Sequence, residues 1–131
     1  MRESPLDESL VRTSGHRPAV AYQSALELLQ LPERPTAIFC TDDMEALQAI
    51  RAAYRLGLRV PEDIQIMGVG NSTEGQEFDP ALTTVGPEPI FEQVVRMLLD
   101  RLSGATPDEG IRVESPWKLH RRGTTLPGQC S

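Results

Sequence analysis

A short apolar run that ends at two acidic residues constrains the fold of this chain more than any other feature. The run covers Ala37 to Cys40 and stops at Asp42 and Asp43, where a helical pattern begins at once. A strand that runs directly into a helix N-terminus is typical of open α/β sheets, whose ligands bind at the carboxyl ends of the strands. The run therefore predicts an α/β fold with a ligand site at one sheet edge.

The same strand-to-helix pattern recurs along the chain. It predicts strands at Leu10–Thr13, Thr36–Cys40 and Ile64–Val69, helices at Pro18–Gln30, Asp43–Leu56 and Glu88–Ser103, a brief extended piece at Leu82–Val85, and short closing strands at Ile111–Val113 and Trp117–Leu119. Alternating strands and helices imply a parallel sheet with right-handed crossovers. We therefore expect a three-layer α/β lobe, a parallel sheet flanked by helices. Asp42 and Glu45 also have the spacing of a capping box for the second helix.

Composition narrows the class of protein. The chain has 131 residues, 39% of them hydrophobic, and a formal net charge of −6. This length suffices for one domain with a real core, and the negative charge disfavours direct contact with nucleic acid. No apolar run is long enough to span a membrane, and no signal-peptide pattern stands at the N-terminus. A cytoplasmic protein without membrane contact is expected.

Polar residues follow each of the three predicted strands. His16 comes after the first, Thr41 and Asp43 after the second, and Gly70 and Asn71 after the third. Because parallel strands end at the same edge, we expect these residues to gather at one rim and to bind a small polar ligand. Simpler roles stay open: one acid is enough to cap a helix, Asn71 suits a turn, and His16 suits an exposed loop.

Enzyme signatures are missing from the sequence. No His-Glu-x-x-His zinc motif and no Gly-x-Ser-x-Gly nucleophile motif is present. Gly68-Val69-Gly70 lacks the third glycine of a dinucleotide loop. The acid pair at 42–43 is similar to that of response-regulator receivers, but Lys118, the sole lysine, does not complete that site. We therefore expect no catalysis, no cofactor and no metal site.

Several ordered motifs between residues 17 and 125 resemble one protein family, the LacI/GalR-type transcriptional regulators, in the C-terminal half of those proteins. The motifs are Pro35–Phe39, Asp43 with Ala46, Gly57–Ile64, Met67-Gly68, Pro80–Val85 and Leu119–Thr125. The resemblance implies one lobe of a periplasmic-binding-protein-like fold. In that family, two such lobes clasp a small effector, often a sugar or a nucleobase, and the C-terminal lobe helps to form a homodimer.

The resemblance also implies a division of the chain and a set of site residues. Residues 10–125 form the lobe, with 83–117 as a crossover segment that packs on an N-terminal lobe; residues 1–9 are frayed and 126–131 are a tail. The effector-facing positions fall on His16, Thr41, Asp43, Gly70 and Asn71. Gly70 stands where the family has a ligand-binding aspartate, which weakens the case for a sugar.

Three functions follow as alternatives, of which the last is a remnant that binds no ligand and acts only through association. The first is a ligand-responsive transcriptional regulator that acts as a homodimer and reaches operator DNA only through a helix-turn-helix that this chain lacks. The second is a solute-binding protein of a transport system, which shares the fold. The lack of an export signal favours the first.

Overall fold

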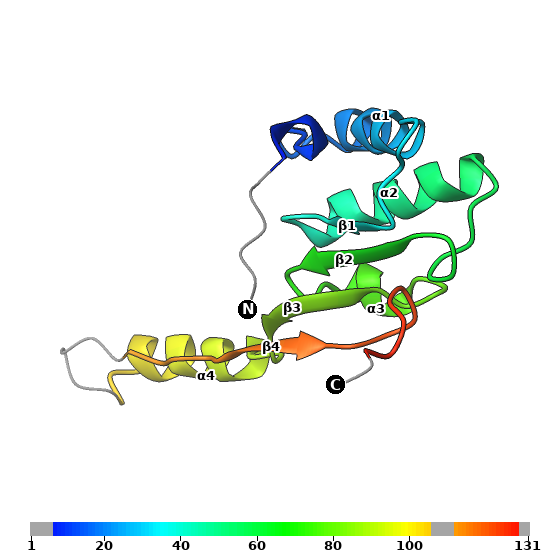
Figure 1. Cartoon of the computed structure of the whole chain (residues 1–131). Helices are drawn as coiled ribbons and strands as arrows, with labels where there is room; N and C mark the ends of the chain where they lie inside the picture. The colour runs from blue at the N-terminus through cyan, green and yellow to red at the C-terminus, as the bar shows by residue number, and fades with distance from the viewer. Residues whose placement is uncertain (1–6, 106–111, 129–131) are drawn as a thin grey trace.

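The computed structural model describes residues 7–105 and 112–128, and they form a four-stranded sheet with helices (Figure 1). The strands are β1 (Ala37–Phe39), β2 (Gln65–Val69), β3 (Thr83–Pro87) and β4 (Trp117–His120). The α-helices are α1 (Pro18–Leu29), α2 (Asp43–Arg55), α3 (Thr73–Glu77) and α4 (Phe91–Leu102), and a 3₁₀ helix, η1, covers Glu8–Leu10.

The sheet has the order β1-β2-β3-β4. β1, β2 and β3 are parallel, whereas β4 returns antiparallel to β3 and places Trp117 opposite Pro87. The three parallel strands end at a common edge, but β3 takes the place of the strand predicted at Leu10–Thr13. The predicted α/β lobe is thus confirmed, with one antiparallel strand added at its border.

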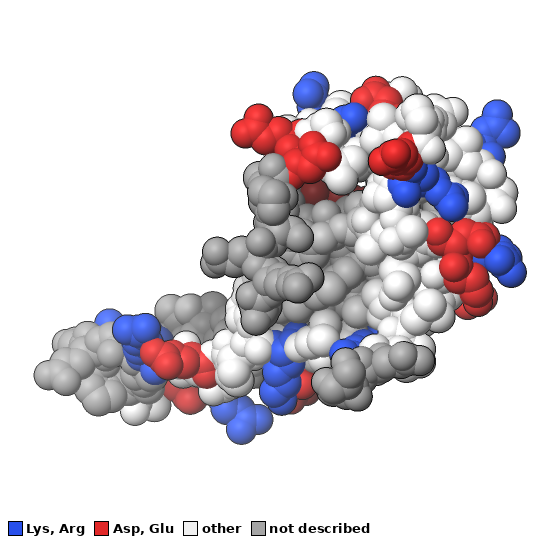
Figure 2. Space-filling model, viewed as in Figure 1, with Lys and Arg blue, Asp and Glu red and all other residues white. Residues whose placement is uncertain are grey.

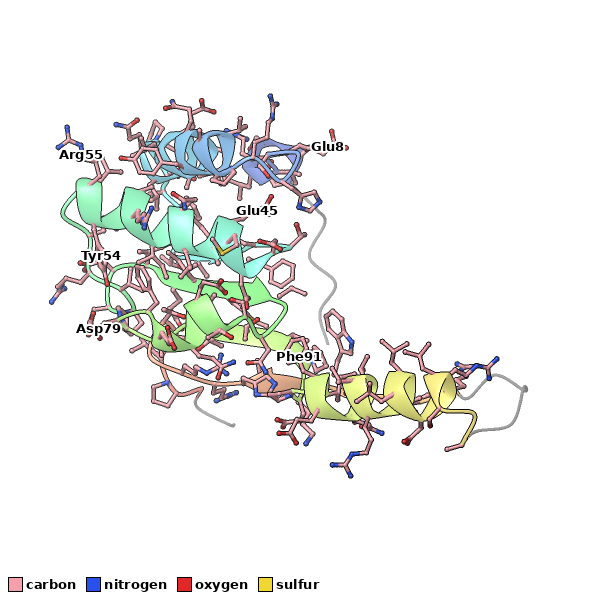
Figure 3. The ribbon with its side chains drawn as sticks, turned by 180° about the vertical axis from the view of Figure 1, so that it is seen from behind. Glu8, Glu45, Tyr54, Arg55, Asp79 and Phe91 are labelled. Carbon is pink, nitrogen blue, oxygen red and sulfur yellow. The ribbon has the colours of Figure 1, made fainter. Side chains whose placement is uncertain are left out.

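The core lies between α2 and the sheet. Figures 1 and 3 show α2 and α3 on the same face of the strands, and α1 beside α2. Small residues on α2, among them Ala46, Ala49 and Ala53, let this helix approach β2 closely, and Ile50 and Ile66 fill the contact without exposure to solvent. Burying side chains of this size stabilises a fold by about 1.5–3 kcal/mol each.

The strand predicted at Leu10–Thr13 is wrong. Leu10 ends η1, and residues 11–14 follow without pairing to any strand. Arg12 instead donates hydrogen bonds to the main-chain oxygens of Ser9 and Val11. As a consequence β1 is an edge strand in the described structure, and Phe39 is 62% exposed. The third parallel strand is β3, which the sequence pattern indicated only as a brief extended piece.

Several smaller differences concern loops and ends. Helix α3 occupies a stretch that the sequence pattern predicts to be a loop, and Ser72 caps it by accepting a hydrogen bond from the Gly75 amide at 3.1 Å. Of the strand predicted at Ile111–Val113, residue 111 lies outside the described residues and 112–113 are not in a strand. Parts of the predicted frayed end and tail, 1–6 and 129–131, also lie outside them.

Helix α4 differs from the other long helices because it extends away from the sheet (Figures 1 and 2). None of its residues is buried, and its large apolar side chains are exposed: Phe91, Val94, Val95, Leu98, Leu99 and Leu102. We call residues 91–102 the arm. Within the described residues, no helix is long and apolar enough to cross a membrane.

Candidate functional site

The candidate site is the rim formed by residues 14–16, 41–43 and 70–72: the last two segments follow β1 and β2, and the first precedes α1. Asp43 is its most buried member at 2% exposure. Its Oδ1 accepts a hydrogen bond from the Thr84 hydroxyl at 2.6 Å, and its Oδ2 accepts one from the Ser72 amide at 2.7 Å. The first residue of α2 therefore ties together β3 and the loop that follows β2.

Gly68 in β2 makes the close approach of Asp43 possible. A Cβ atom at this position would lie 2.4 Å from the Asp43 Oδ1 atom, which is closer than real Cβ contacts come. Asp43 is thus a structural carboxylate that shapes the rim, and its oxygens are already used by the protein.

Gly70 and Asn71 turn the chain at the end of β2 with positive φ angles of 132° and 56°. The Asn71 side chain is turned toward β3 and its exit. Its Nδ2 donates to the Pro87 main-chain oxygen at 2.9 Å, and its Oδ1 accepts from Arg122 Nη2 at 2.6 Å. Both ends of the amide are therefore engaged within the protein.

Glu45 connects the other two rim loops, a role that the sequence pattern missed. It accepts hydrogen bonds from the hydroxyls of Ser14 and Thr41, the latter at 3.2 Å, and one of its oxygens lies 3.9 Å from His16 Nδ1. Figure 3 shows Glu45 on the side of α2 that faces the N-terminal segment. The predicted capping box is half correct: Asp42 caps α2 by accepting from the Met44 amide at 2.7 Å, whereas Glu45 holds the loops.

A cavity of about 620 Å³ opens beside this cluster, between the 10–16 segment, α1 and the free side of β1. Its wall is mostly apolar, with Leu28, Ile38 and Phe39 among its lining residues, and His16 and Thr41 are among the polar residues that line it. Cys40 also lines it. Burial raises the pKa of the Cys40 thiol to about 12, and the carboxylates of Glu45 and Asp42 add to the effect, so the thiol stays protonated at neutral pH.

The geometry brings all five predicted site residues to the rim but gives them two kinds of environment. His16 is highly exposed and Thr41 is exposed, and both line the cavity. Asp43 and Asn71 are held by internal hydrogen bonds, and Gly70 offers only its main chain. Among the described residues, no group of three or more His, Cys, Asp or Glu side chains is placed to hold a metal ion.

Parallel strands that end at a polar rim beside a cavity define a small-molecule-binding lobe of the α/β type. The chain belongs to the family of periplasmic binding protein-like domains, whose sequence pattern matches residues 1–125. The fold class and the resemblance to LacI/GalR-type regulators are thereby confirmed.

Individual relatives agree with this assignment. The chain is 37% identical over 120 residues to the HTH-type transcriptional repressor PurR of Photorhabdus laumondii, which covers 90% of this chain. A LacI family transcriptional regulator from Enterococcus faecium with bound ribose superposes with a TM-score of 0.68 at 29% identity, over 87% of this chain and 42% of its own. The transcriptional regulator CelR in complex with cellobiose gives 0.66 at 30% identity, over 91% and 37%.

The chain spans about a third of the length of the curated relatives it matches, 35% in the case of the Photorhabdus repressor. What those proteins do as wholes is therefore a matter of proposal for this chain. That these relatives are transcriptional regulators favours the regulator over the transport protein.

Proposed function

We propose that this chain is the effector-binding lobe of a cytoplasmic transcriptional regulator and has no catalytic activity of its own. The observation that carries the proposal is the polar rim beside the ends of the parallel strands β1 and β2, in a chain whose relatives are transcriptional repressors. The effector is a small polar molecule, a sugar or a nucleobase. Two of the similar solved structures hold ribose and cellobiose.

The site residues divide by role in this proposal. His16 and Thr41 contact the effector, since they are exposed and line the cavity. The main chain at Gly70 leaves room for it. Asp43 and Asn71 position the loops, because their side-chain polar atoms are already bonded within the lobe.

The arm supports the part of the proposal that concerns an N-terminal lobe and a homodimer. Its exposed apolar residues need cover, because leaving several large apolar side chains in water forgoes about 1.5–3 kcal/mol each. The crossover segment 83–117 would pack on an N-terminal lobe in a longer protein. Such a protein would act as a homodimer and would reach operator DNA through a helix-turn-helix, with effector binding shifting the populations of two lobe arrangements.

Isothermal titration calorimetry with ribose, cellobiose and guanine tests the effector site. We expect one of these classes to bind, and we expect Thr41→Val to weaken that binding because it removes a hydroxyl at the cavity. Thr73→Val is the matched control, since Thr73 lies exposed at the start of α3. Equal affinities of the two variants would contradict the assigned site, and no heat with any of the three would contradict the effector class.

A further inference from the structure

The arm joins the body of the lobe through two neighbouring strands. The chain leaves at the end of β3, at Pro87, and α4 begins at Phe91. It returns at the start of β4, where Trp117 pairs with Pro87. Pro87 and Trp117 are therefore the points at which both connections of the arm join the sheet.

Asn71 holds the exit from the rim side. Its Nδ2 donates to the Pro87 main-chain oxygen at 2.9 Å, and its Cβ would lie 2.7 Å from a Cβ added at Gly86, so β3 and Asn71 are in direct contact. Only a glycine at position 86 permits this approach.

Arg122 completes the connection on the returning chain. Its Nη2 donates to Asn71 Oδ1 at 2.6 Å, and its Nη1 donates to the Leu82 main-chain oxygen at 2.8 Å. Its amide donates to the Thr83 hydroxyl at 2.9 Å. One asparagine side chain thus joins the loop after β2 to the end of β3 and to the segment that follows β4.

We propose that Asn71 is a positioning residue that latches the arm to the rim. The proposal deepens the proposed function, because it matters for regulation only if the rim binds effector. Asn71 directly follows Gly70 at the rim, so a displacement of this loop moves Pro87 with it. A ligand that bonds to the Asn71 amide competes with Pro87 or Arg122 and so changes how firmly the arm is held. Two sites coupled through one element in this way have the physical requirement for allostery.

The two halves of the amide can be separated by substitution. Asn71→Asp keeps the acceptor for Arg122 and gains charge complementarity with it, but it replaces the donor that faces the Pro87 oxygen by a second acceptor. Asn71→Ala removes both bonds. A purely structural role would make Asn71→Ala the more damaging variant in every measurement, whereas the latch requires both variants to release Pro87.

Trp117 reports on the latch, because it is the sole tryptophan of the chain and pairs with Pro87. We would measure its fluorescence anisotropy and its quenching by acrylamide in the whole chain without effector. We expect lower anisotropy and stronger quenching in Asn71→Asp and in Asn71→Ala than in the wild type. Gln76→Ala is the matched control. Gln76 Nε2 donates to the Asn71 main-chain oxygen at 3.2 Å, so this substitution leaves both hydrogen bonds of the Asn71 side-chain amide intact. It should leave the anisotropy and the quenching of Trp117 unchanged.

Urea unfolding of the same samples establishes that each variant is folded. Wild-type signals from Trp117 in a folded Asn71→Asp would overturn the latch, and so would an equal change in Gln76→Ala. An Asn71→Asp protein that does not fold would also overturn it, because Asn71 would then be needed for the fold and not for the arm. The Trp117 measurements are made without effector, so their outcome does not depend on the effector titration. A failure of the latch can therefore be distinguished from a failure of the proposed function.

Discussion

Helices α2 and α4 have similar lengths and similar amphipathic patterns but opposite surroundings. Seven residues of α2 are buried, and its small side chains lie against the sheet. In α4 no residue is buried, and Phe91 at its start is 80% exposed (Figure 3). The apolar stripe predicts a helix in both cases. Whether the stripe has a partner depends on residues elsewhere, and most helical stability in proteins comes from such packing.

The comparison teaches where the stability of this chain resides. The free energy of unfolding should depend on α2 and on the strands it covers, and it should be nearly indifferent to the apolar face of the arm. The substitutions below test that contrast, from the largest expected effect to the smallest.

Ile50→Ala should have the largest effect. Ile50 is fully buried on α2, and removing its side chain leaves a cavity that typically costs about 2–5 kcal/mol. Leu98→Ala on the arm is the matched comparison, and we expect it to change stability by about 0.5 kcal/mol or less. Urea unfolding followed by circular dichroism measures both. Similar losses would mean that the arm is packed against something, and the contrast would fail.

Thr84→Val tests the buried polar contact at the rim. The Thr84 hydroxyl donates to Asp43 Oδ1 at 2.6 Å, and both residues are buried. Valine keeps the shape but leaves the carboxylate short of a donor, which should cost about 1–3 kcal/mol. Thr13→Val, at an exposed position, serves as the control in the same unfolding measurement. If the two variants are equally stable, Asp43 does not depend on β3.

Asp42→Ala removes the cap of α2 and should destabilise the chain by about 1 kcal/mol. The Asp42 carboxylate accepts from the Met44 amide, and its charge also suits the helix N-terminus. Asp100→Ala, in the last turn of the arm, removes the same charge where it serves no cap. Thermal unfolding should show a lower midpoint for the first variant only. A matching drop in the second would point to net charge as the cause.

Cys40 gives the smallest effect and a dependence on pH. The folded thiol has a pKa raised to about 12 from its ordinary value of 9.0, mainly because it is buried. The contribution of Cys40 to the free energy of unfolding is fully present below the pKa of the thiol in the unfolded chain. It is lost as the pH rises toward the pKa of the thiol in the folded chain. At pH 9, where half of the unfolded thiol is ionised, the loss relative to pH 7 is about 0.4 kcal/mol. This loss is measured by urea unfolding at several pH values of two proteins, Cys130→Ser alone and Cys130→Ser combined with Cys40→Ala. If the unfolding free energies of the two proteins change with pH in the same way, the Cys40 thiol is not buried.

Local patterns were sufficient for most elements of the fold. Helices α1, α2 and α4 lie within a few residues of their predicted bounds, because stripes at helical spacing, Pro18 near a start and Gly57 after an end are local signals. The strand at 10–13 failed because a strand is defined by its pairing partner, and none pairs with it in the described structure. The short helix α3 was missed because its residues, with Gly75 inside it, also suit a loop.

The candidate site was predicted in part. Thr41, Asp43, Gly70 and Asn71 meet because the parallel strands β1 and β2 end at one edge, whereas His16 follows no strand and reaches the rim through the loop before α1. The contact of Glu45 with Ser14 and that of Arg122 with Asn71 were not predictable. They join residues that are 31 and 51 positions apart, respectively, and no local spacing encodes such pairs.

The amino-acid sequence by itself determined the α/β class, the family and the positions that reach the rim, because periodicity, caps and ordered motifs are properties of neighbouring residues. Only the tertiary structure decided which rim side chains are exposed at the cavity, and that the apolar face of α4 is exposed while that of α2 is covered. Hydrogen-bond partners and burial depend on residues distant in the chain, and they exist only once the strands have set those residues side by side.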